Sequence, residues 1–193
     1  MRAPFRLGAG GTLGVLNLPA AAPGLTLMTQ FFPCGFWPIE LRAAYFFTVE
    51  SELSSGELEL PLESFMALRF PPEGSGVRGS AAQLDAALCP IQHPVGGGLL
   101  LACGGAYVGA AFIEGYGFAP NRSESRLQLG FEAHARFNFA ISGGLGFTYS
   151  AGVVAPLLRQ QFGYHDHDGE FVKTFQVAPV GGRLDLLLTY GFQ

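Results

Sequence analysis

Apolar and polar positions alternate over long stretches of this chain. From Leu127 to Ile141 every second residue is apolar, and the interleaved positions are mainly charged, polar or small. A strand places alternate positions on opposite faces of a sheet. The segment is longer than the usual strand of about 5–6 residues and is long enough to cross a bilayer when tilted. The pattern predicts a transmembrane strand with an uncharged outward face.

The same alternation recurs in four further segments, whose apolar positions run through 5–15, 37–49, 145–157 and 184–192. Their interleaved positions are largely polar or very small, which suits the inside of a narrow barrel. Aromatic residues begin or end the outward faces, as membrane interfaces favour. We therefore expect an all-β fold, an antiparallel up-and-down transmembrane β-barrel that residues 1–193 form as a single domain.

Composition supports this class of protein. Charged residues make up 13% of the chain, about half the usual share in soluble domains, and 28 residues are glycine. So few charges would not coat a soluble globule, and a disordered chain would be richer in them. The net charge of −4 excludes the basic surplus of a nucleic-acid binder, so we expect no nucleic-acid partner.

One stretch, Val95 to Ile113, is uncharged and nearly long enough for a membrane helix. It contains six glycines and directly follows Pro94, so its helix propensity is poor. Because the rest of the chain shows the period of strands, we prefer strands here too.

The end of the last alternating segment carries a family resemblance. Apolar residues at every second position from Leu184 lead into Tyr190 and Phe192, with Gln193 after them. This ending resembles the terminal strand of bacterial outer-membrane β-barrel proteins, where Phe is normally the final residue. The resemblance implies a multi-pass protein of the bacterial outer membrane, in contact with the lipid bilayer and recognised by the barrel-assembly machinery during biogenesis.

Turn lengths predict the number of strands. Barrels of this family have short periplasmic turns, longer outer loops and an even number of strands. Tight or Gly/Pro-marked connections occur at 32–36, 90–98 and 142–144. Placing these three on one side gives eight strands, at about 4–17, 24–32, 37–50, 76–89, 97–116, 123–141, 145–162 and 171–192.

A ten-strand barrel is the alternative. Residues 57–70 also alternate and would pair with 37–50 in that case, with 171–178 and 183–192 as separate strands. We prefer eight strands because the ten-strand register scatters the short turns over both sides. Residues 57–70 are then an external excursion or an extension of the second hairpin.

The layout also resembles small, uncharacterised eight-stranded outer-membrane proteins. The shared features are a Cys pair flanking the middle turn and a Pro-Leu-x-Arg…Asp-Gly stretch before the last strand. Here these are Cys89, Cys103, residues 156–159 and residues 168–169. The resemblance implies no known activity, and the insertion at 51–75 is the main departure from it.

Three cysteines allow one disulfide and one unpaired thiol. Cys89 and Cys103 flank the Gly-rich turn and would face each other across a hairpin centred on Gly96, and an oxidising periplasm permits the bond. Three buried thiols are an equally weighted alternative. Cys34 lies in a turn and is the expected unpaired residue. No signal peptide precedes the alternation, so we expect the sequence to be the mature form of an exported protein.

Candidate chemistry lies on the inward strand positions. The predicted lumen charge network consists of Glu40, Arg42, Glu50, Arg126, Glu132, His134, Arg136, Arg183 and Asp185. Opposite charges would neutralise each other there and offset their desolvation. The alternative is a lipid-modifying enzyme in which His134 acts as base, Glu132 orients it and Ser150 is the nucleophile. We prefer the network because catalytic groups must reach lipid, and His134 lies past the middle of its strand.

His165 and His167 would share one side of a strand, as a metal pair needs. The following Asp168-Gly169 favours a hairpin tip instead, and no further His has useful spacing. The Gly-rich run at 8–11 lacks the Lys of a phosphate loop. We expect no metal and no cofactor.

These observations predict a location more than an activity. We expect a structural, anchoring or surface-interaction role without enzymatic activity, through an external partner that the sequence does not identify. One alternative is the lipid-modifying enzyme that uses His134. The other is a passage for small apolar solutes through a lateral opening, with space left by inward glycines in 4–17 and 97–116. A soluble ligand-binding barrel is disfavoured by the uncharged outward faces.

Overall fold

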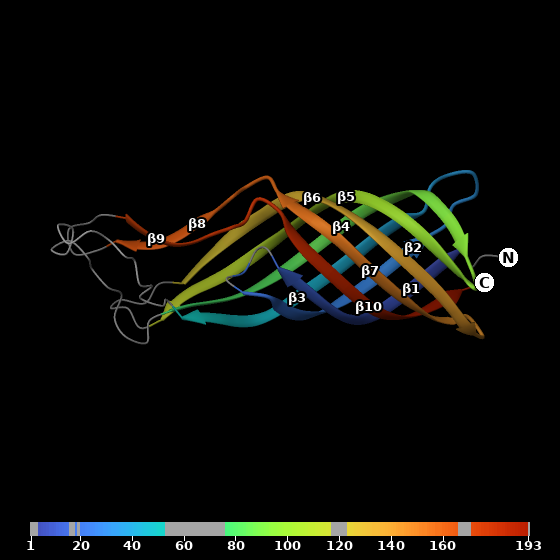
Figure 1. Cartoon of the computed structure of the whole chain (residues 1–193), viewed down its shortest axis with the longest axis horizontal. Coiled ribbons are helices and arrows are strands. Elements are labelled where there is room, and N and C mark those ends of the chain that lie inside the picture. The colour runs from blue at the N-terminus through green and yellow to red at the C-terminus, as the bar shows by residue number, and fades with distance from the viewer. Residues whose placement is uncertain are drawn as a thin grey trace.

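The computed structural model describes residues 4–15, 18, 20–52, 76–116, 123–165 and 171–192. Its strands are β1 (Phe5–Val15), β2 (Ala22–Phe31), β3 (Ile39–Glu52), β4 (Gly76–Val95), β5 (Gly98–Tyr116), β6 (Ser123–Ser142), β7 (Leu145–Pro156), β8 (Gln161–His165), β9 (Phe171–Gln176) and β10 (Gly181–Phe192). Eight of them close into an antiparallel barrel in the order β1-β10-β7-β6-β5-β4-β3-β2, and β8 pairs with β9 (Figure 1). The predicted eight-stranded, all-antiparallel barrel is confirmed. In the described part of the chain, no helix has the length and hydropathy of a membrane span.

The first and last strands of the chain close the barrel. β1 pairs with β10 from Phe5↔Phe192 to Val15↔Gly182, an unbroken antiparallel ladder. Both termini therefore lie at one end of the barrel, and the β8–β9 hairpin projects beyond the other end (Figure 1). Every other barrel strand pairs with its neighbour in sequence, except that β8 and β9 lie between β7 and β10 along the chain.

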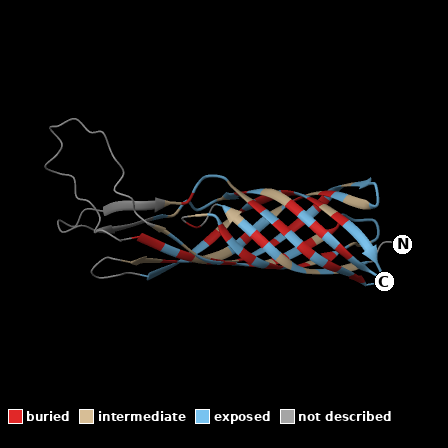
Figure 2. Cartoon of the chain, turned by 60° about the horizontal axis from the view of Figure 1, so that its bottom comes forward, coloured by how far each residue is buried: buried red, intermediate tan, exposed pale blue. Residues whose placement is uncertain are grey.

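The alternation of the sequence becomes an alternation of burial around the barrel wall (Figure 2). The predicted inward positions of the five patterned segments are mostly buried, and the predicted outward ones are mostly exposed. Large apolar side chains such as Leu27 and Phe131 are 63% and 57% exposed, and such residues surround the barrel. An apolar surface of this extent is the lipid-facing belt of a transmembrane barrel.

Three tight turns lie at the end that holds the termini. Among the described residues, positive φ angles occur only at Gly35, Gly96, Gly143 and Gly144, all of which lie in these turns. Glycine tolerates this conformation because it has no Cβ. These are the three connections that the sequence places together on the periplasmic side.

Four strands extend further at the opposite end. Pairing between β3 and β4 reaches Glu52↔Gly76, whereas β2 stops pairing with β3 at Gly24↔Phe46. β7 likewise stops pairing with β6 at Pro156↔Gly130. Residues 47–52, 76–80, 112–116 and 123–129 therefore rise above the rest of the barrel, and we call this part the tall wall.

The strand boundaries differ from the predicted ones in three places. The predicted strand 145–162 is interrupted after Pro156, and 171–192 is interrupted between Gln176 and Gly181, so the ten-strand alternative was right about this second break. The separated pieces form the β8–β9 hairpin and add no barrel strand.

The turn predicted at 90–98 is also shorter than expected. β4 continues to Val95 through a register shift between Leu88 and Ile91. Pro90 lies in this shift, where the missing N–H of proline costs no ladder bond. The alternating segment 57–70 and the Asp168-Gly169 tip lie outside the described residues.

Candidate functional site

Arg42 of β3 is the centre of a buried ion-pair network inside the barrel. Its guanidinium contacts carboxylates from four strands: Nε lies 3.1 Å from Glu40 Oε1 and 3.6 Å from Asp85 Oδ2, and Nη1 donates to Asp185 Oδ2 at 2.9 Å. Nη2 donates to Glu132 Oε2. All five side chains are at most 2% exposed. These contacts cross-link β3, β4, β6 and β10 through the barrel interior.

Two further arginines extend the network towards both ends of the barrel. Arg183 donates to Asp85 Oδ2 at 2.7 Å, to Asp185 Oδ1 at 2.9 Å and to Thr26 Oγ1 at 3.1 Å. Arg136, which is fully buried, donates to Glu40 Oε2. Three guanidinium groups thus face four carboxylates, so the charges nearly cancel where the desolvation of an unpaired charge would be most costly.

His134 is held within this network rather than presented to lipid. Its Nε2 lies 3.3 Å from Glu40 Oε1 and its Nδ1 lies 3.7 Å from Glu132 Oε1, with the side chain 3% exposed. Ser150 Oγ donates to Asp185 Oδ2 at 2.8 Å instead of to His134. A nucleophile must be hydrogen-bonded to its base, and this arrangement does not pair Ser150 with His134.

The space left beside His134 is very small. The cavity bounded by Arg42, Glu132, His134, Ser150 and Asp185 has a volume of about 10 Å³, with parts of Gly152–Val154 and Arg183 completing its wall. That volume holds about one water molecule. A lipid or an acyl chain does not fit.

The structure does not bring two of the predicted residues into the network. Glu50 is exposed, and the exposed Arg126 donates to Glu124 Oε2 at 2.5 Å. Arg126 lies in the tall wall beyond the last rung of β7, where the barrel no longer encloses the inward face. Glu50 follows the register shift between Phe46 and Val49, which pairs it with Arg78 on the outward face. Their predicted place in the lumen is therefore corrected to the outer rim.

Asp85 was not predicted as part of the network, yet it contacts two of its arginines. Its signal is present: Gln83, Asp85 and Cys89 occupy alternate buried positions in β4, between exposed apolar residues such as Leu84 and Leu88. Gln83 Nε2 donates to Asp85 Oδ1 at 2.5 Å. The short alternating stretch at 81–89 was sufficient to place this carboxylate inside.

Cys89 and Cys103 form a disulfide between β4 and β5, and Cys34 is free and exposed in the first turn. The bond lies at the register shift of β4 and packs with Ala87 and Leu101. One sulfur, Cys103 Sγ, also lies within 4.8 Å of ligand atoms of Glu40 and His134. Because Cys103 is in the disulfide, only two metal-ligating groups remain there, which is fewer than a zinc site uses.

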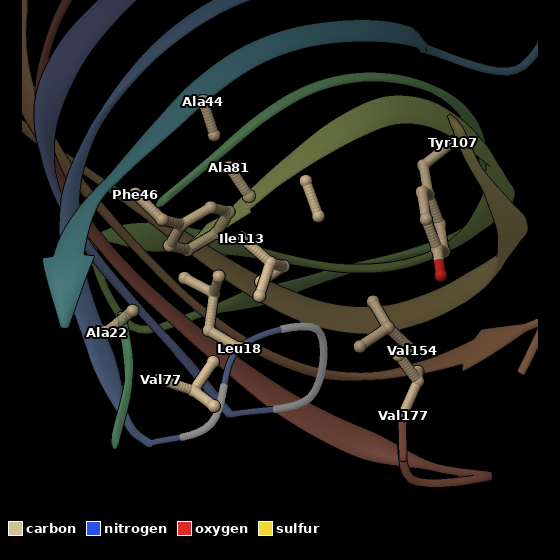
Figure 3. Packing of buried hydrophobic residues seen from close by; sticks show 11 residues of the cluster. Leu18, Ala22, Ala44, Phe46, Val77, Ala81, Tyr107, Ile113, Val154 and Val177 are labelled. Carbon is tan, nitrogen blue, oxygen red and sulfur yellow. The ribbon is translucent and has the colours of Figure 1, made fainter. Parts of the chain in front are cut away.

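An apolar cluster, which we call the plug, fills the barrel towards its outer end. It consists of Leu18, Ala22, Ala44, Phe46, Val77, Ala81, Tyr107, Ala111, Ile113, Val154 and Val177. Figure 3 shows Leu18, from the connection between β1 and β2, pointing in among Phe46, Ile113 and Val77. All members are at most 6% exposed. The plug separates the ion-pair network from the outer mouth.

Inward glycines accommodate neighbours instead of leaving a passage. A Cβ on Gly14 would lie 2.7 Å from the Phe46 ring, so this glycine makes room for the plug. A Cβ on Gly105 would lie 2.0 Å from the carbonyl oxygen of Ala86, so here the adjacent strand occupies the space. The space expected for apolar solutes at these positions is filled.

A larger cavity lies on the tall wall, outside the barrel interior. Its volume is about 480 Å³, within the range typical of ligand sites. Its described lining consists of Thr48, Arg78, Gly79, Ser80, Phe112, Ile113, Glu114, Ser123, Glu124 and Ser125. We call this cavity the rim pocket.

Comparisons with known proteins place the fold. A major outer membrane protein of Thermus thermophilus superposes with a TM-score of 0.59 at 13% identity, over 97% of this chain and 99% of that one. The outer membrane protein OprG of Pseudomonas aeruginosa superposes with a TM-score of 0.55 at 13% identity, over 100% of this chain and 97% of that one. A third structure is that of Ail, the attachment invasion locus protein of Yersinia pestis, in complex with the heparin analogue sucrose octasulfate. It superposes with a TM-score of 0.54 at 12% identity, over 99% of both chains.

No protein-family model and no curated protein matches the sequence. The similarity to the solved structures is at low identity and therefore concerns the fold, which is that of small outer-membrane β-barrels.

Proposed function

We propose that this chain is an integral outer-membrane barrel with a closed interior that acts at its outer surface, in a structural, anchoring or surface-interaction role. The single observation that supports this most is the double closure of the lumen, by the ion-pair network around Arg42 and by the plug. One protein of the same fold, Ail, is an attachment invasion locus protein, and we extend a surface-contact role to this chain.

Electrical recording tests the closed interior. We expect the full chain, reconstituted in planar bilayers, to leave the ion conductance at the level of the bare lipid, because the cavity beside the network is about 10 Å³ and the plug fills the lumen above it. Sustained conductance above that of bare lipid would contradict the proposal. A porin reconstituted in the same way gives the positive control.

The absence of enzymatic activity is part of the proposal. His134 contacts carboxylates on two sides and no hydroxyl nucleophile among the described contacts. We expect outer-membrane lipids from cells producing the wild type, the His134→Ala variant or neither protein to have the same composition by mass spectrometry. A modified lipid that appears with the wild type and disappears with His134→Ala would establish the enzymatic alternative.

Solute passage remains the weaker alternative. The plug occupies the outer part of the interior, and the inward glycines at 14 and 105 face a ring and a backbone carbonyl. Liposomes containing the protein should take up small apolar solutes at the rate of empty liposomes. Faster uptake would favour the passage.

We also propose that the barrel-assembly machinery recognises β10. Phe192 packs against Tyr190 and Phe5, with ring centroids 5.0 and 5.8 Å apart, on the outward face of the closing seam. Phe192→Ser should reduce the amount of heat-modifiable barrel in outer-membrane fractions. Phe147→Ser, at a similarly exposed outward position of β7, is the matched control and should have the smaller effect.

A further inference from the structure

We propose that the rim pocket binds a saccharide. The inference deepens the proposed surface-interaction role by naming the chemical class of the ligand, and it rests on that role. The saccharide can come from two sources, which are the sugar headgroup of a glycolipid in the outer leaflet and a free glycan outside the cell.

The strand register places the pocket at the outer boundary of the lipid-facing belt. Ser80, Phe112 and Ser125 form one rung across β4, β5 and β6. Below this rung the outward positions are apolar on all three strands, at Ala82, Leu84 and Ala86, at Ala106, Val108 and Ala110, and at Leu127, Leu129 and Phe131. The rung itself therefore marks the change from lipid-facing to polar surface.

The next rung on the same face, two residues further towards the outer end of each strand, is charged and polar. It consists of Arg78, Glu114 and Ser123, again side by side across the three strands. Arg78 donates to Glu114 Oε2 from Nε at 3.1 Å and from Nη2 at 2.9 Å, which fixes both groups on the wall. These two rungs supply six of the residues that line the rim pocket.

The lining matches the hydrogen-bonding capacity of a sugar. Thr48, Ser80, Ser123 and Ser125 contribute hydroxyl groups, which both donate and accept. Each sugar hydroxyl also donates and accepts hydrogen bonds, so it can be either the donor or the acceptor to these Ser and Thr hydroxyls. The two carboxylates of the lining accept hydrogen bonds, and the guanidinium of Arg78 donates them.

The lining also provides an apolar surface and excludes a strongly anionic ligand. Phe112, at the base of the pocket, is 46% exposed, and an aromatic ring can pack against the C–H face of a sugar ring. Arg78 in the lining pairs with Glu114, and the other carboxylate of the lining, Glu124, pairs with Arg126. A polysulfated or polyphosphorylated ligand would meet no unpaired cation in the described lining, so we infer a neutral saccharide unit.

The binding experiment uses the full chain in nanodiscs. The probes are a neutral, phosphate-free oligosaccharide released from the outer part of lipopolysaccharide, added in solution, and nanodiscs made with or without intact lipopolysaccharide. Isothermal titration calorimetry measures binding of the free oligosaccharide. Hydrogen–deuterium exchange of residues 76–80 and 112–116 measures binding of the intact lipopolysaccharide in the nanodisc. We expect saturable binding of the free oligosaccharide or protection of these residues by the glycolipid, and the arm that responds identifies the source.

Paired variants separate the pocket from general effects on the barrel. Phe112→Ala and Ser125→Ala should each weaken binding by about tenfold, which corresponds to about 1.4 kcal/mol. Phe139→Ala and Ser142→Ala, at exposed positions near the opposite end of the barrel, should leave binding unchanged. Heat-modifiability of each variant confirms that it forms the barrel.

Two outcomes would overturn the inference. The first is that neither probe binds the wild type; the second is that the variants at Phe112 and Ser125 bind as well as their controls. Neither result bears on the closed interior, which the conductance experiment tests separately.

Discussion

The ion-pair network and the plug close the same lumen by different chemistry. In the network, long charged side chains from facing strands reach across the barrel and neutralise each other around Arg42. In the plug, residues such as Leu18 and Phe46 exclude water by apolar packing just inside the outer mouth. Removing one side chain from the network therefore leaves an uncompensated buried charge, whereas removing one from the plug leaves a cavity.

The largest effect is expected from Arg42→Ala. Removing the shared guanidinium leaves Glu132 without its arginine partner and Asp185 with Arg183 alone, and breaking a buried pair in this way costs about 3–5 kcal/mol. Urea unfolding in detergent micelles measures the change in the free energy of unfolding. Combining Arg42→Met with Asp185→Asn should cost less than the sum of the two single changes. A decrease in the free energy of unfolding below about 1 kcal/mol for Arg42→Ala, as for an exposed ion pair, would show that no uncompensated charge is left in the network.

In the plug, Phe46→Ala should cost about 3 kcal/mol through the cavity it leaves. It should leave the ion conductance at the level of the bare lipid, because the ion-pair network still closes the lumen. Phe47→Ala is the matched control, since Phe47 is 43% exposed on the outward face whereas Phe46 is 6% exposed. Equal losses of unfolding free energy in the two variants would show that enclosure in the plug does not set the contribution of Phe46.

Much of the fold was predictable from the sequence because the barrel imposes a strict two-residue period. Alternation over 127–141 assigned each side chain of that segment to a face, and the glycine turns assigned the ends of the barrel. The interruptions at Pro156 and before Gly181 were not predicted as bends of one hairpin. Alternation is clear only up to Leu157 and again from Leu184, and it does not show whether a strand continues in the same sheet.

The disulfide should have the third largest effect. Replacing both Cys89 and Cys103 by Ser should lower the free energy of unfolding by about 2 kcal/mol, since the bond closes a short loop that β4 and β5 already pair. Cys34→Ser, at the exposed free thiol, should leave it unchanged. A change as large as that of Arg42→Ala would mean that the disulfide, rather than the network, determines the stability of the interior.

The smallest effect is expected from Arg126→Ala. Arg126 pairs with Glu124 on the open rim, and exposed pairs contribute about 0–1 kcal/mol. Arg136→Ala in the same strand removes a fully buried partner of Glu40 and should cost several times more. Unfolding free energies of the two variants at low and high salt check this, because only the exposed pair is screened. Equal losses would show that enclosure by the barrel does not set the strength of these pairs.

The candidate site was predicted less completely than the fold. The two-residue period assigned Glu40, Arg42, Glu132, His134, Arg136, Arg183 and Asp185 to inward positions, and the structure buries them. It also assigned Glu50 and Arg126 to inward positions. The period shows neither the register shift before Glu50 nor where the strand beside Arg126 ends. The rim pocket could not be predicted, because it depends on which residues of β4, β5 and β6 share a rung.

The seam between β1 and β10 has a consequence for biogenesis. Its rungs join residues as far apart as Phe5 and Phe192, so the barrel cannot close before nearly the whole chain is present. Contacts between such distant residues form late, since the intervening chain must first be ordered. Until then β1 and β7 each expose an unpaired edge, so an incomplete chain has two strand edges open to association with other chains. Because β10 is synthesised last, its pairing with β1 and β7 is the event that covers both exposed strand edges.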